Sequence, residues 1–152
     1  MKTSPPFWIS KPLNHFTYEE WERLCDRCGL CCIHKLEDQD GNLYLTDVAC
    51  KYLDIEKIWC RCYEKRDQKQ ALCRSLTSEN IAENLNWLPK TCAYRRIYEN
   101  SPLPDWHPLI SNDPDAIQKA GWTIQNKVVS ERLFPIIDWE KHVVSNDYFD
   151  HG

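Results

Sequence analysis

The sequence predicts a small, irregular α+β protein, rich in α-helix, with short helices and a few short strands organised around a cysteine or metal centre. Three observations support this prediction: a length of 152 residues, helix-capping signals near several polar residues, and nine cysteines crowded into residues 25–92. A chain of this length fits one ordinary domain. We therefore expect one domain over residues 1–152, with a cysteine block at 25–92 and a part with helices and strands at 93–152.

The first helix is expected to begin after Thr17 and to run to about residue 24. Glu20 stands three residues after Thr17, which is the spacing of a capping box. Phe16 and Trp21 stand at the positions of a hydrophobic staple. Local sequence therefore predicts both the start of this helix and the direction from which the chain enters it.

The cysteine block is expected to be less regular. Gly29 favours a turn within residues 25–32. The Asp-Gly pair at 40–41 predicts a turn, the alternation at 43–46 a short strand, and Asp47 a cap for a short helix to Tyr52. Residues 60–70 lack a periodic pattern and are expected to form a loop.

Later segments carry further capping and turn signals. Helical patterns are expected at 78–86 and at 92–99, the second capped by Thr91. The remaining expectations are a helix from Asp113–Pro114 to Gly121, a strand at 122–129, a helix at 139–144 capped by Asp138, and extended proline-rich connectors at 5–12 and 102–108.

Composition excludes several classes of protein. Apolar residues make up 42% of the chain, which argues against disorder, and 19 basic against 23 acidic residues give a net charge of −4. This charge argues against a general nucleic-acid binder or a membrane-surface protein. No apolar run has the length of a membrane span or of a signal peptide, so a cytoplasmic location is expected.

Thiols are the unusual feature of the chain. Numerous clustered thiols in a reducing compartment most often bind metal, and an odd number leaves one unpaired in any set of disulfides. Four of them fall within eight residues, in a C-x2-C-x2-C-C arrangement. The candidate metal ligands are Cys25, Cys28, Cys31, Cys32, Cys50, Cys60, Cys62, Cys73 and Cys92.

Spacing favours an iron–sulfur cluster over zinc, without excluding zinc. The run Cys25–Cys31 is similar to the start of a bacterial ferredoxin motif, and the second C-x2-C pair of a zinc ribbon is absent. Cys31 and Cys32 are adjacent, so their side chains diverge and should not bind one tetrahedral ion. The sequence therefore predicts two centres, or one centre with a spare thiol.

Some residues have two readings that the sequence leaves open. For both Cys50 and Cys73, a role in packing and a role in metal binding are equally supported, because a thiol is also a small apolar group. His34 is a candidate ligand or hydrogen-bond donor to a thiolate, or an ordinary surface histidine. The basic loop 57–74 can stabilise thiolates, lie solvated, or, with Trp59 and Tyr63 inside it, contact RNA.

Several motifs of the chain carry a resemblance to a known family. They are Cys25-Asp26-x-Cys28-Gly29-x-Cys31-Cys32-x-His34-Lys35-Leu36, Val48-Ala49-Cys50, Cys60-x-Cys62, Trp87-Leu88-Pro89-x-Thr91-Cys92-Ala93-Tyr94-Arg95 and Leu103-Pro104-x-Trp106-His107-Pro108-Leu109. With these motifs the sequence resembles the short bacterial YcgN-like cysteine-cluster proteins, within the wider CxxCxxCC group of zinc- or iron-chelating domains. The resemblance covers the full length and all nine cysteines, and it implies metal chelation.

Three hypotheses about function follow. The first is a cytoplasmic metal-binding protein that holds an iron–sulfur cluster or Zn2+, with a metal or cluster as its only assigned partner. The second is a thiol redox protein or cysteine-dependent enzyme that uses Cys31 or Cys32, with His34 or Lys35 favouring the thiolate. The third is an interaction module with a structural metal. No nucleophile elbow, phosphate loop or dinucleotide fingerprint is present, so the sequence assigns no catalytic residue.

Overall fold

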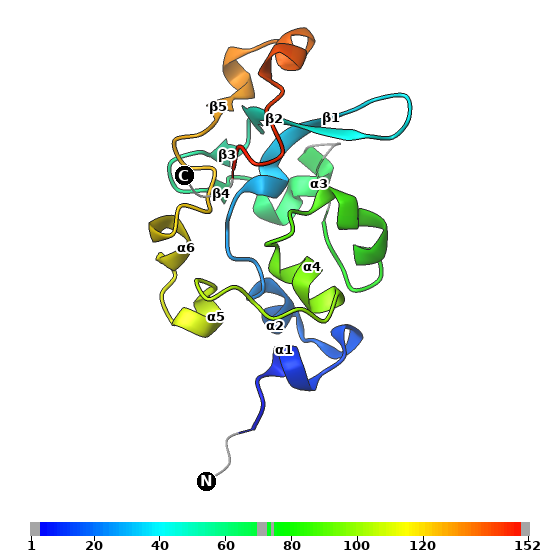
Figure 1. Ribbon diagram of the computed structural model, residues 1–152, viewed down its shortest axis with the longest axis vertical. Helices are drawn as coiled ribbons and strands as arrows, with labels where there is room; N and C mark the ends of the chain where they lie inside the picture. Colours follow the sequence, from blue (N-terminus) through cyan, green and yellow to red (C-terminus); the bar gives the residue numbers. More distant parts are fainter. Residues whose placement is uncertain (1–3, 70–72, 74, 150–152) are drawn as a thin grey trace. The chain divides into compact units, whose positions relative to one another are not determined.

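The computed structural model describes residues 4–69, 73 and 75–149, and it has a mixed α/β structure of short helices and short strands (Figure 1). The chain divides into two compact units. Unit 1 is formed by Met1–Asp26 and Leu76–Ala116, and unit 2 by Arg27–Ser75 and Ile117–Gly152. The prediction of one domain over residues 1–152 stays a prediction.

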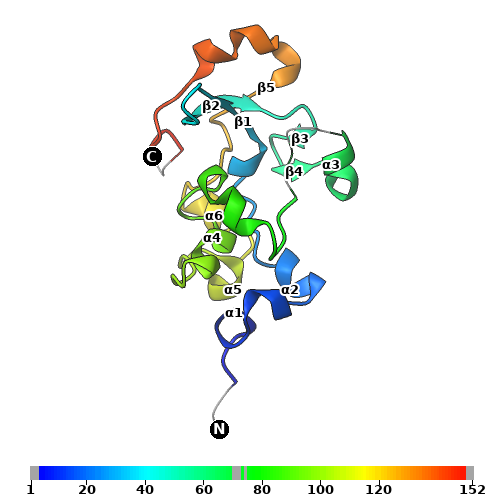
Figure 2. The ribbon, with the colours of Figure 1, turned by 90° about the vertical axis from the view of Figure 1, so that its right-hand side faces the viewer.

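Unit 1 contains the short helices of the N-terminal and middle segments (Figure 2). Its α-helices are α1 (Phe7–Ser10), α2 (Tyr18–Glu22), α4 (Ala93–Tyr98) and α5 (Pro108–Ser111), and its 3-10 helices are η1 (Leu13–His15) and η4 (Ile81–Trp87). The capping box at α2 is confirmed, because the Glu20 amide donates to Thr17 Oγ1 at 3.1 Å and the Thr17 amide donates to Glu20 Oε1 at 2.9 Å. The predicted staple is also present, with the rings of Phe16 and Trp21 6.5 Å apart.

Aliphatic and aromatic side chains fill the core of unit 1. Its buried members are Leu24, Ile81, Leu88, Ala93, Tyr94 and Leu103. The Tyr94 hydroxyl donates to the carbonyl of Trp21 at 2.9 Å, and the Trp21 indole donates to the carbonyl of Leu76 at 3.0 Å. Helices that are distant in sequence are thus joined by apolar contact and by hydrogen bonds from the polar ends of aromatic residues.

One buried histidine also joins unit 1. His107 is fully buried, and its Nδ1 accepts the Leu109 amide at 3.0 Å at the start of α5. Nδ1 therefore carries no proton, so Nε2–H is the donor to the Leu24 carbonyl 2.8 Å away. The neutral imidazole satisfies one orphan amide of α5 and one buried carbonyl at the end of α2.

Unit 2 is built on a β-hairpin. Strands β1 (Ile33–Glu37) and β2 (Leu43–Ala49) are antiparallel, with Leu36 opposite Tyr44, and they form the longest strands of the unit (Figure 1). Gly41 has φ +83° in the connecting turn, as the Asp-Gly pair predicts. The parallel strand β5 (Val129–Ser130) pairs with the end of β2.

Shorter elements complete unit 2. These are η2 (Leu30–Cys32), β3 (Leu53–Asp54), β4 (Trp59–Cys60), η3 (Tyr63–Lys65), α3 (Arg66–Lys69), η5 (Glu131–Leu133) and η6 (Ile136–His142), and α6 (Ala116–Lys119) begins at the boundary of the two units. Strands β3 and β4 form a separate antiparallel pair, and η6 contacts β2. Figures 1 and 2 both show the segment from β5 to η6, in orange, beside the β1–β2 hairpin.

Gly29 lies at a close approach of the backbone to the core of unit 2. The buried members of this core are Leu30, Ile33, Ala49, Leu53, Ile58, Ile124 and Phe149. Gly29 has φ +84°, and a Cβ atom there would stand 2.7 Å from Ile124 and 2.9 Å from Ile58. Both the backbone angle and the close approach require glycine at the turn that leads into η2.

Several local expectations were wrong in the cysteine block. Asp47 caps no helix, because β2 runs on to Ala49. The loop expected at 60–70 contains the end of β4, η3 and α3 within its described residues. Strand pairing and tertiary contacts determined the secondary structure of these segments and overrode the weak local signals.

Other corrections concern helix starts and one strand. The helix predicted after Thr91 is α4, but its N-cap is Cys92, which makes no side-chain capping bond. The helix predicted from Pro114 begins at Ala116, and η6 begins after Pro135 rather than after Asp138. Of the strand expected at 122–129, only Val129 lies in a strand, at the start of β5.

Two further predictions were wrong, one about the type of a helix and one about an extended connector. The segment predicted as a helix at 78–86 is the 3-10 helix η4, and residues Phe7–Ser10 of a supposed extended connector form α1. Short helices of this kind depend on tertiary packing more than on propensity.

Within the part of the chain that the structure describes, no helix has both the length and the apolar character needed to cross a bilayer.

Candidate functional site

The nine cysteines, all among the described residues, are thiols rather than disulfides. Seven of them belong to unit 2, and Cys25 and Cys92 belong to unit 1. Cys25 and Cys31 are exposed and the rest are half-buried. Unit 2 therefore brings together seven of the nine candidate ligands in a single compact body.

The turn at Gly29 and the short helix η2 position Cys31 and Cys32. The Cys32 amide donates to the Gly29 carbonyl at 2.9 Å, which closes the turn. The Cys50 amide donates to the Cys32 carbonyl at 2.8 Å. Main-chain bonds thus hold the residue at the end of β2 against the C-x2-C-C segment.

The β3–β4 pair positions a second group of thiols. Cys60 lies opposite Leu53 in this pair, and the Arg61 amide donates to the Tyr52 carbonyl at 2.8 Å. Cys62 precedes η3, and its carbonyl accepts the Lys65 amide at 2.8 Å. The two sulfur atoms of this C-x-C segment, those of Cys60 and Cys62, are 3.7 Å apart.

The Cys31 thiol has the strongest acid shift in the group. A hydrogen bond from the Cys32 thiol, assisted by the positive charges of Lys35 and Arg66, lowers the pKa of Cys31 to about 6. Lys35 Nζ is held by the Leu30 carbonyl at 2.8 Å, and an Arg66 guanidinium nitrogen is held by the Tyr63 carbonyl. Cys31 is therefore a thiolate at neutral pH.

The neighbouring thiols are shifted in the opposite direction. Donation to Cys31, burial, and the negative charges of Cys31, Cys60 and Cys50 raise the pKa of Cys32 well above its ordinary value. Burial first, and then the charge of other cysteines, raises the pKa of Cys73 to about 11. Burial and Cys60 raise the pKa of Cys62, while Lys69 opposes them. These thiols lie close enough to repel each other's charge, and a cation placed among them would relieve that repulsion.

No three side chains of His, Cys, Asp or Glu within the described residues are arranged so that they could hold a metal ion. The predicted ligand set of nine cysteines therefore stays a prediction. Packing accounts for part of it, since Cys28 and Cys32 lie against the core of unit 2 and Cys92 lies against the core of unit 1. Cys60 and Cys62 supply two donors at close range, and a complete site requires further thiols to turn toward them.

His34 belongs to a second polar group in unit 2. It is buried and stacks on Trp139 with ring centroids 4.0 Å apart, and its Nε2 lies 3.2 Å from Glu131 Oε1 without the alignment of a hydrogen bond. Burial lowers the pKa of His34, although Glu131 opposes this effect. The Lys51 amide donates to the same Glu131 oxygen at 2.7 Å.

This arrangement corrects the reading of His34 as a surface residue. No spacing in the sequence could have linked it to Glu131 and Trp139, which are about 100 residues away in the chain. Within the described residues, His34 is not part of any group of three side chains that could hold a metal ion.

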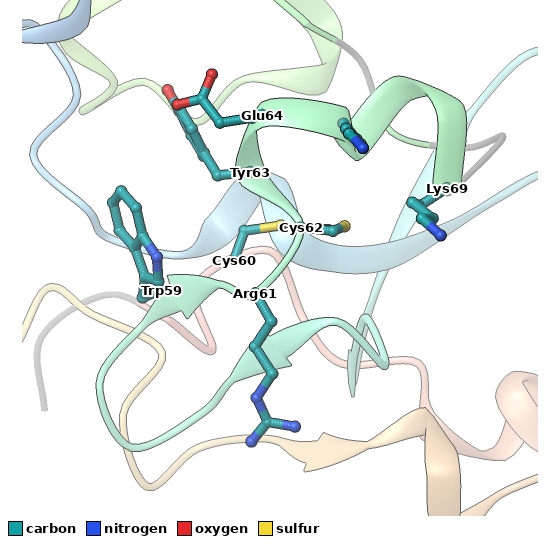
Figure 3. A pocket seen from close by; sticks show the side chains of 8 residues that line it. Trp59, Cys60, Arg61, Cys62, Tyr63, Glu64 and Lys69 are labelled. Atoms are coloured by element: carbon teal, nitrogen blue, oxygen red, sulfur yellow. Dashed lines mark hydrogen bonds between the residues drawn. The ribbon is translucent and has the colours of Figure 1, made fainter.

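A hollow of about 400 Å3 lies beside the C-x-C thiols (Figure 3). It is lined by Trp59, Cys60, Arg61, Cys62, Tyr63, Glu64, Lys65 and Lys69. In Figure 3 the Cys62 side chain extends toward the side on which Lys69 lies, whereas Glu64 and Trp59 lie on the other side. Three of the basic residues of the predicted loop 57–74, namely Arg61, Lys65 and Lys69, therefore border a sulfur-containing hollow, while Arg74 lies outside the described residues.

The fold and site define a cysteine-rich protein of short helices and strands, in which thiols are concentrated in one compact unit. Comparison with known proteins gives its family. The chain is 48% identical over 140 residues to a UPF0260 protein of Marinobacter nauticus (91% of this chain and 94% of the relative) and 49% identical over 141 residues to one of Vibrio campbellii (92% of each). A UPF0260 protein of Cellvibrio japonicus is 46% identical over 139 residues, 91% of this chain and 94% of the relative.

The chain belongs to the UPF0260 family, a bacterial family. No family model matches the chain. No solved structure matches it either.

Proposed function

We propose that this UPF0260 protein is a cysteine-cluster protein that binds metal through the thiols of unit 2, as an iron–sulfur cluster or as zinc. The proposal includes the YcgN-like character suggested by the sequence. The observation that supports it best is the 3.7 Å separation of the Cys60 and Cys62 sulfurs beside further thiols that affect one another's pKa. Of the seven thiols in this unit, Cys28 and Cys32 pack against the described core.

The distance suits a metal that takes both sulfurs. A tetrahedral ion with metal–sulfur bonds of about 2.3 Å separates two of its sulfurs by about 3.8 Å. Cys60 and Cys62 already have this separation. A [4Fe–4S] cluster takes one cysteine on each iron, so this pair fits zinc or one iron of a [2Fe–2S] cluster better than two corners of a cube.

Charge also favours metal. The raised pKa values of Cys32, Cys62 and Cys73 have the charge of other cysteines among their causes. A cation would stabilise all of these thiolates together, and binding would release protons. The remaining thiols, including Cys25, Cys28, Cys50 and Cys92, are proposed as further ligands on the resemblance and the sequence motif alone.

Anaerobic purification tests this proposal, followed by elemental analysis and a visible spectrum. Brown absorbance with iron and acid-labile sulfide identifies a cluster, and a colourless protein with about one or two zinc ions per chain identifies zinc.

The variant Cys60→Ser/Cys62→Ser should lose half or more of the metal and melt at a lower temperature, because metal binding and folding are coupled. Glu64→Gln lines the same hollow without sulfur and is the matched control.

Two results would contradict the proposal. One is a wild-type protein without metal that also fails to take up zinc or iron when these are supplied. The other is an unchanged metal content in Cys60→Ser/Cys62→Ser.

A second candidate function is supported by Cys31. An exposed thiol with a pKa of about 6 beside a protonated Cys32 has the properties of a reactive nucleophile. If this is the function, metal-free protein stays folded and Cys31 reacts far faster than every other thiol. Slow and uniform alkylation of all nine thiols would exclude it.

A further inference from the structure

The hollow beside Cys60 and Cys62 differs in charge from the protein as a whole. The chain carries a net charge of −4, yet three cations and one carboxylate line this hollow. The cations are Arg61, Lys65 and Lys69. A concave surface with an excess of one sign of charge concentrates ligands of the opposite sign.

Stacking and cation–π contacts hold the aromatic side chains that line the hollow. The rings of Trp59 and Tyr63 stack with centroids 5.1 Å apart and an angle of 22°. The guanidinium of Arg27 lies 5.0 Å from the Trp59 ring, and that of Arg66 lies 4.1 Å from the Tyr63 ring. Such cation–π contacts hold the stack in place and add further positive charge beside the hollow.

This stack argues against a nucleic-acid base as the ligand. Trp59 and Tyr63 cover part of each other, and a guanidinium lies over each ring. A base that stacks on either ring would compete with these contacts. A small anion needs only the cations at the rim.

The thiols of Cys60 and Cys62 stand among these cations. The charge of Lys69 acts on Cys62 and opposes the rise in its pKa. Arg61 is half-exposed, and its guanidinium is 3.9 Å from a carboxylate oxygen of Asp54. Because an exposed ion pair of this kind is weak, the positive charge of Arg61 remains available to an anion that enters from solvent. The same field repels a hydrated divalent cation and attracts a metal that arrives with negatively charged ligands.

We propose that this hollow binds small polycarboxylate anions, and that it admits metal as an anionic carboxylate complex rather than as the hydrated cation. The entry of metal as an anionic complex rests on the metal-binding function proposed above, whereas the binding of the anion itself does not. Zinc citrate, with one net negative charge, is the simplest complex of this class.

The transfer step balances without any change in oxidation state. The thiols of Cys60 and Cys62 would replace two citrate oxygens on the zinc, so that two Zn–S bonds form as two Zn–O bonds break, and water would replace the remaining citrate oxygens. The two thiol protons pass to solvent. Citrate then leaves as a trianion, and the rim cations are again available for the next complex.

Citrate binding without metal is the first test. Calorimetry of the metal-free protein at low salt should detect citrate, and Lys65→Gln/Lys69→Gln should weaken this binding by about fivefold or more. Lys57→Gln/Lys141→Gln removes the same amount of charge from two exposed lysines outside the lining, and it should change the affinity for citrate less than twofold. Failure of the wild type to bind citrate, equal effects of the two variants, or tighter binding of an eight-nucleotide single-stranded RNA than of citrate would overturn the inference.

Zinc uptake is the second test, followed by the increase in thiolate–zinc absorbance in the ultraviolet. The rate from zinc citrate should fall about tenfold in Lys65→Gln/Lys69→Gln, while the rate from hydrated zinc should stay constant or rise. Equal changes with both zinc sources would overturn the inference although the protein still binds metal. Absence of zinc uptake from either source would overturn the inferred entry of metal as an anionic complex, while the iron content of the purified protein would still decide the proposed function and citrate calorimetry would still decide the anion site.

Discussion

Unit 1 and unit 2 are stabilised by different means. Unit 1 joins its short helices through aliphatic and aromatic contacts and through His107, which makes two hydrogen bonds. Unit 2 has two small sheets and a core of similar size, but it also holds seven of the nine thiols. Only unit 1 therefore has an interior made almost entirely of ordinary packing residues.

This difference separates structural residues from candidate functional ones. A core needs neither an acidic thiolate at Cys31 nor two sulfurs 3.7 Å apart beside a basic hollow. We therefore expect the stability of unit 1 to be independent of the state of the thiols and that of unit 2 to depend on it. Local hydrogen exchange measures the two units separately.

The largest effect is expected from His107→Ala in unit 1. It leaves the Leu24 carbonyl and the Leu109 amide without their partner and opens a cavity, so the free energy of unfolding should fall by about 4 kcal/mol. Hydrogen exchange should accelerate in α4 more than in β2. His15→Ala removes an exposed histidine and serves as the control. A loss below about 1 kcal/mol would show that His107 does not join unit 1.

The next effect is expected from Gly29→Ala in unit 2. A left-handed alanine costs about 1–2 kcal/mol and overpacking against Ile124 and Ile58 costs a further 1–3 kcal/mol, so the total should be about 3 kcal/mol. Gly41→Ala is the matched control, because it has the same φ but meets only Glu37 at 3.7 Å. Denaturant melts should show Gly29→Ala well below Gly41→Ala, and equal losses would contradict the close approach.

A smaller effect concerns thiol reactivity in reduced, metal-free protein. With a pKa of about 6, Cys31 gains thiolate as pH rises from 5 to 7, so its alkylation rate should increase about tenfold and then level off. Cys73, with a pKa of about 11, should remain unreactive up to pH 8. Fragment mass spectrometry after timed iodoacetamide treatment measures both, and a Cys31 rate still rising steeply above pH 8 would refute the low pKa.

The smallest effect is expected from the titration of His34. Its pKa in the folded protein is lowered from the ordinary value of 6.5, so the unfolded chain binds more protons below that pH. Stability should therefore be lost as pH falls below 6.5. His34→Phe keeps a ring against Trp139 and removes this titration, so its stability should vary less between pH 7.5 and 5.5. Identical pH profiles for the two proteins would exclude a contribution from His34.

Features that depend on neighbouring residues were predicted well. The Thr17–Glu20 capping box, the turn at Gly41 and the turn at Gly29 all follow from backbone demands within a few residues. Strand β1 and the full length of β2 were not predicted, because their pairing depends on burial that a local pattern does not reveal. The same limit explains the misplaced cap at Asp47.

The candidate site divides in the same way. Clustering of thiols along the chain already indicated residues 25–92. The contact of Cys60 with Cys62, the charge of Arg66 near Cys31 and the partners of His34 required the folded chain. Cys60 and Cys62 are only two residues apart, but Arg66 and Cys31, and His34 and its partners, lie on segments that are distant in the sequence and meet only in the folded protein.

The order of residues alone determined that clustered thiols are the candidate functional groups of this protein and that its secondary structure is short, because composition and capping act at short range. Tertiary structure decided which thiols share one unit, which of them carry charge, and which cations stand beside them. Electrostatic interactions depend on distance in space and on exclusion of water. A linear sequence contains neither quantity for residues that lie dozens of positions apart.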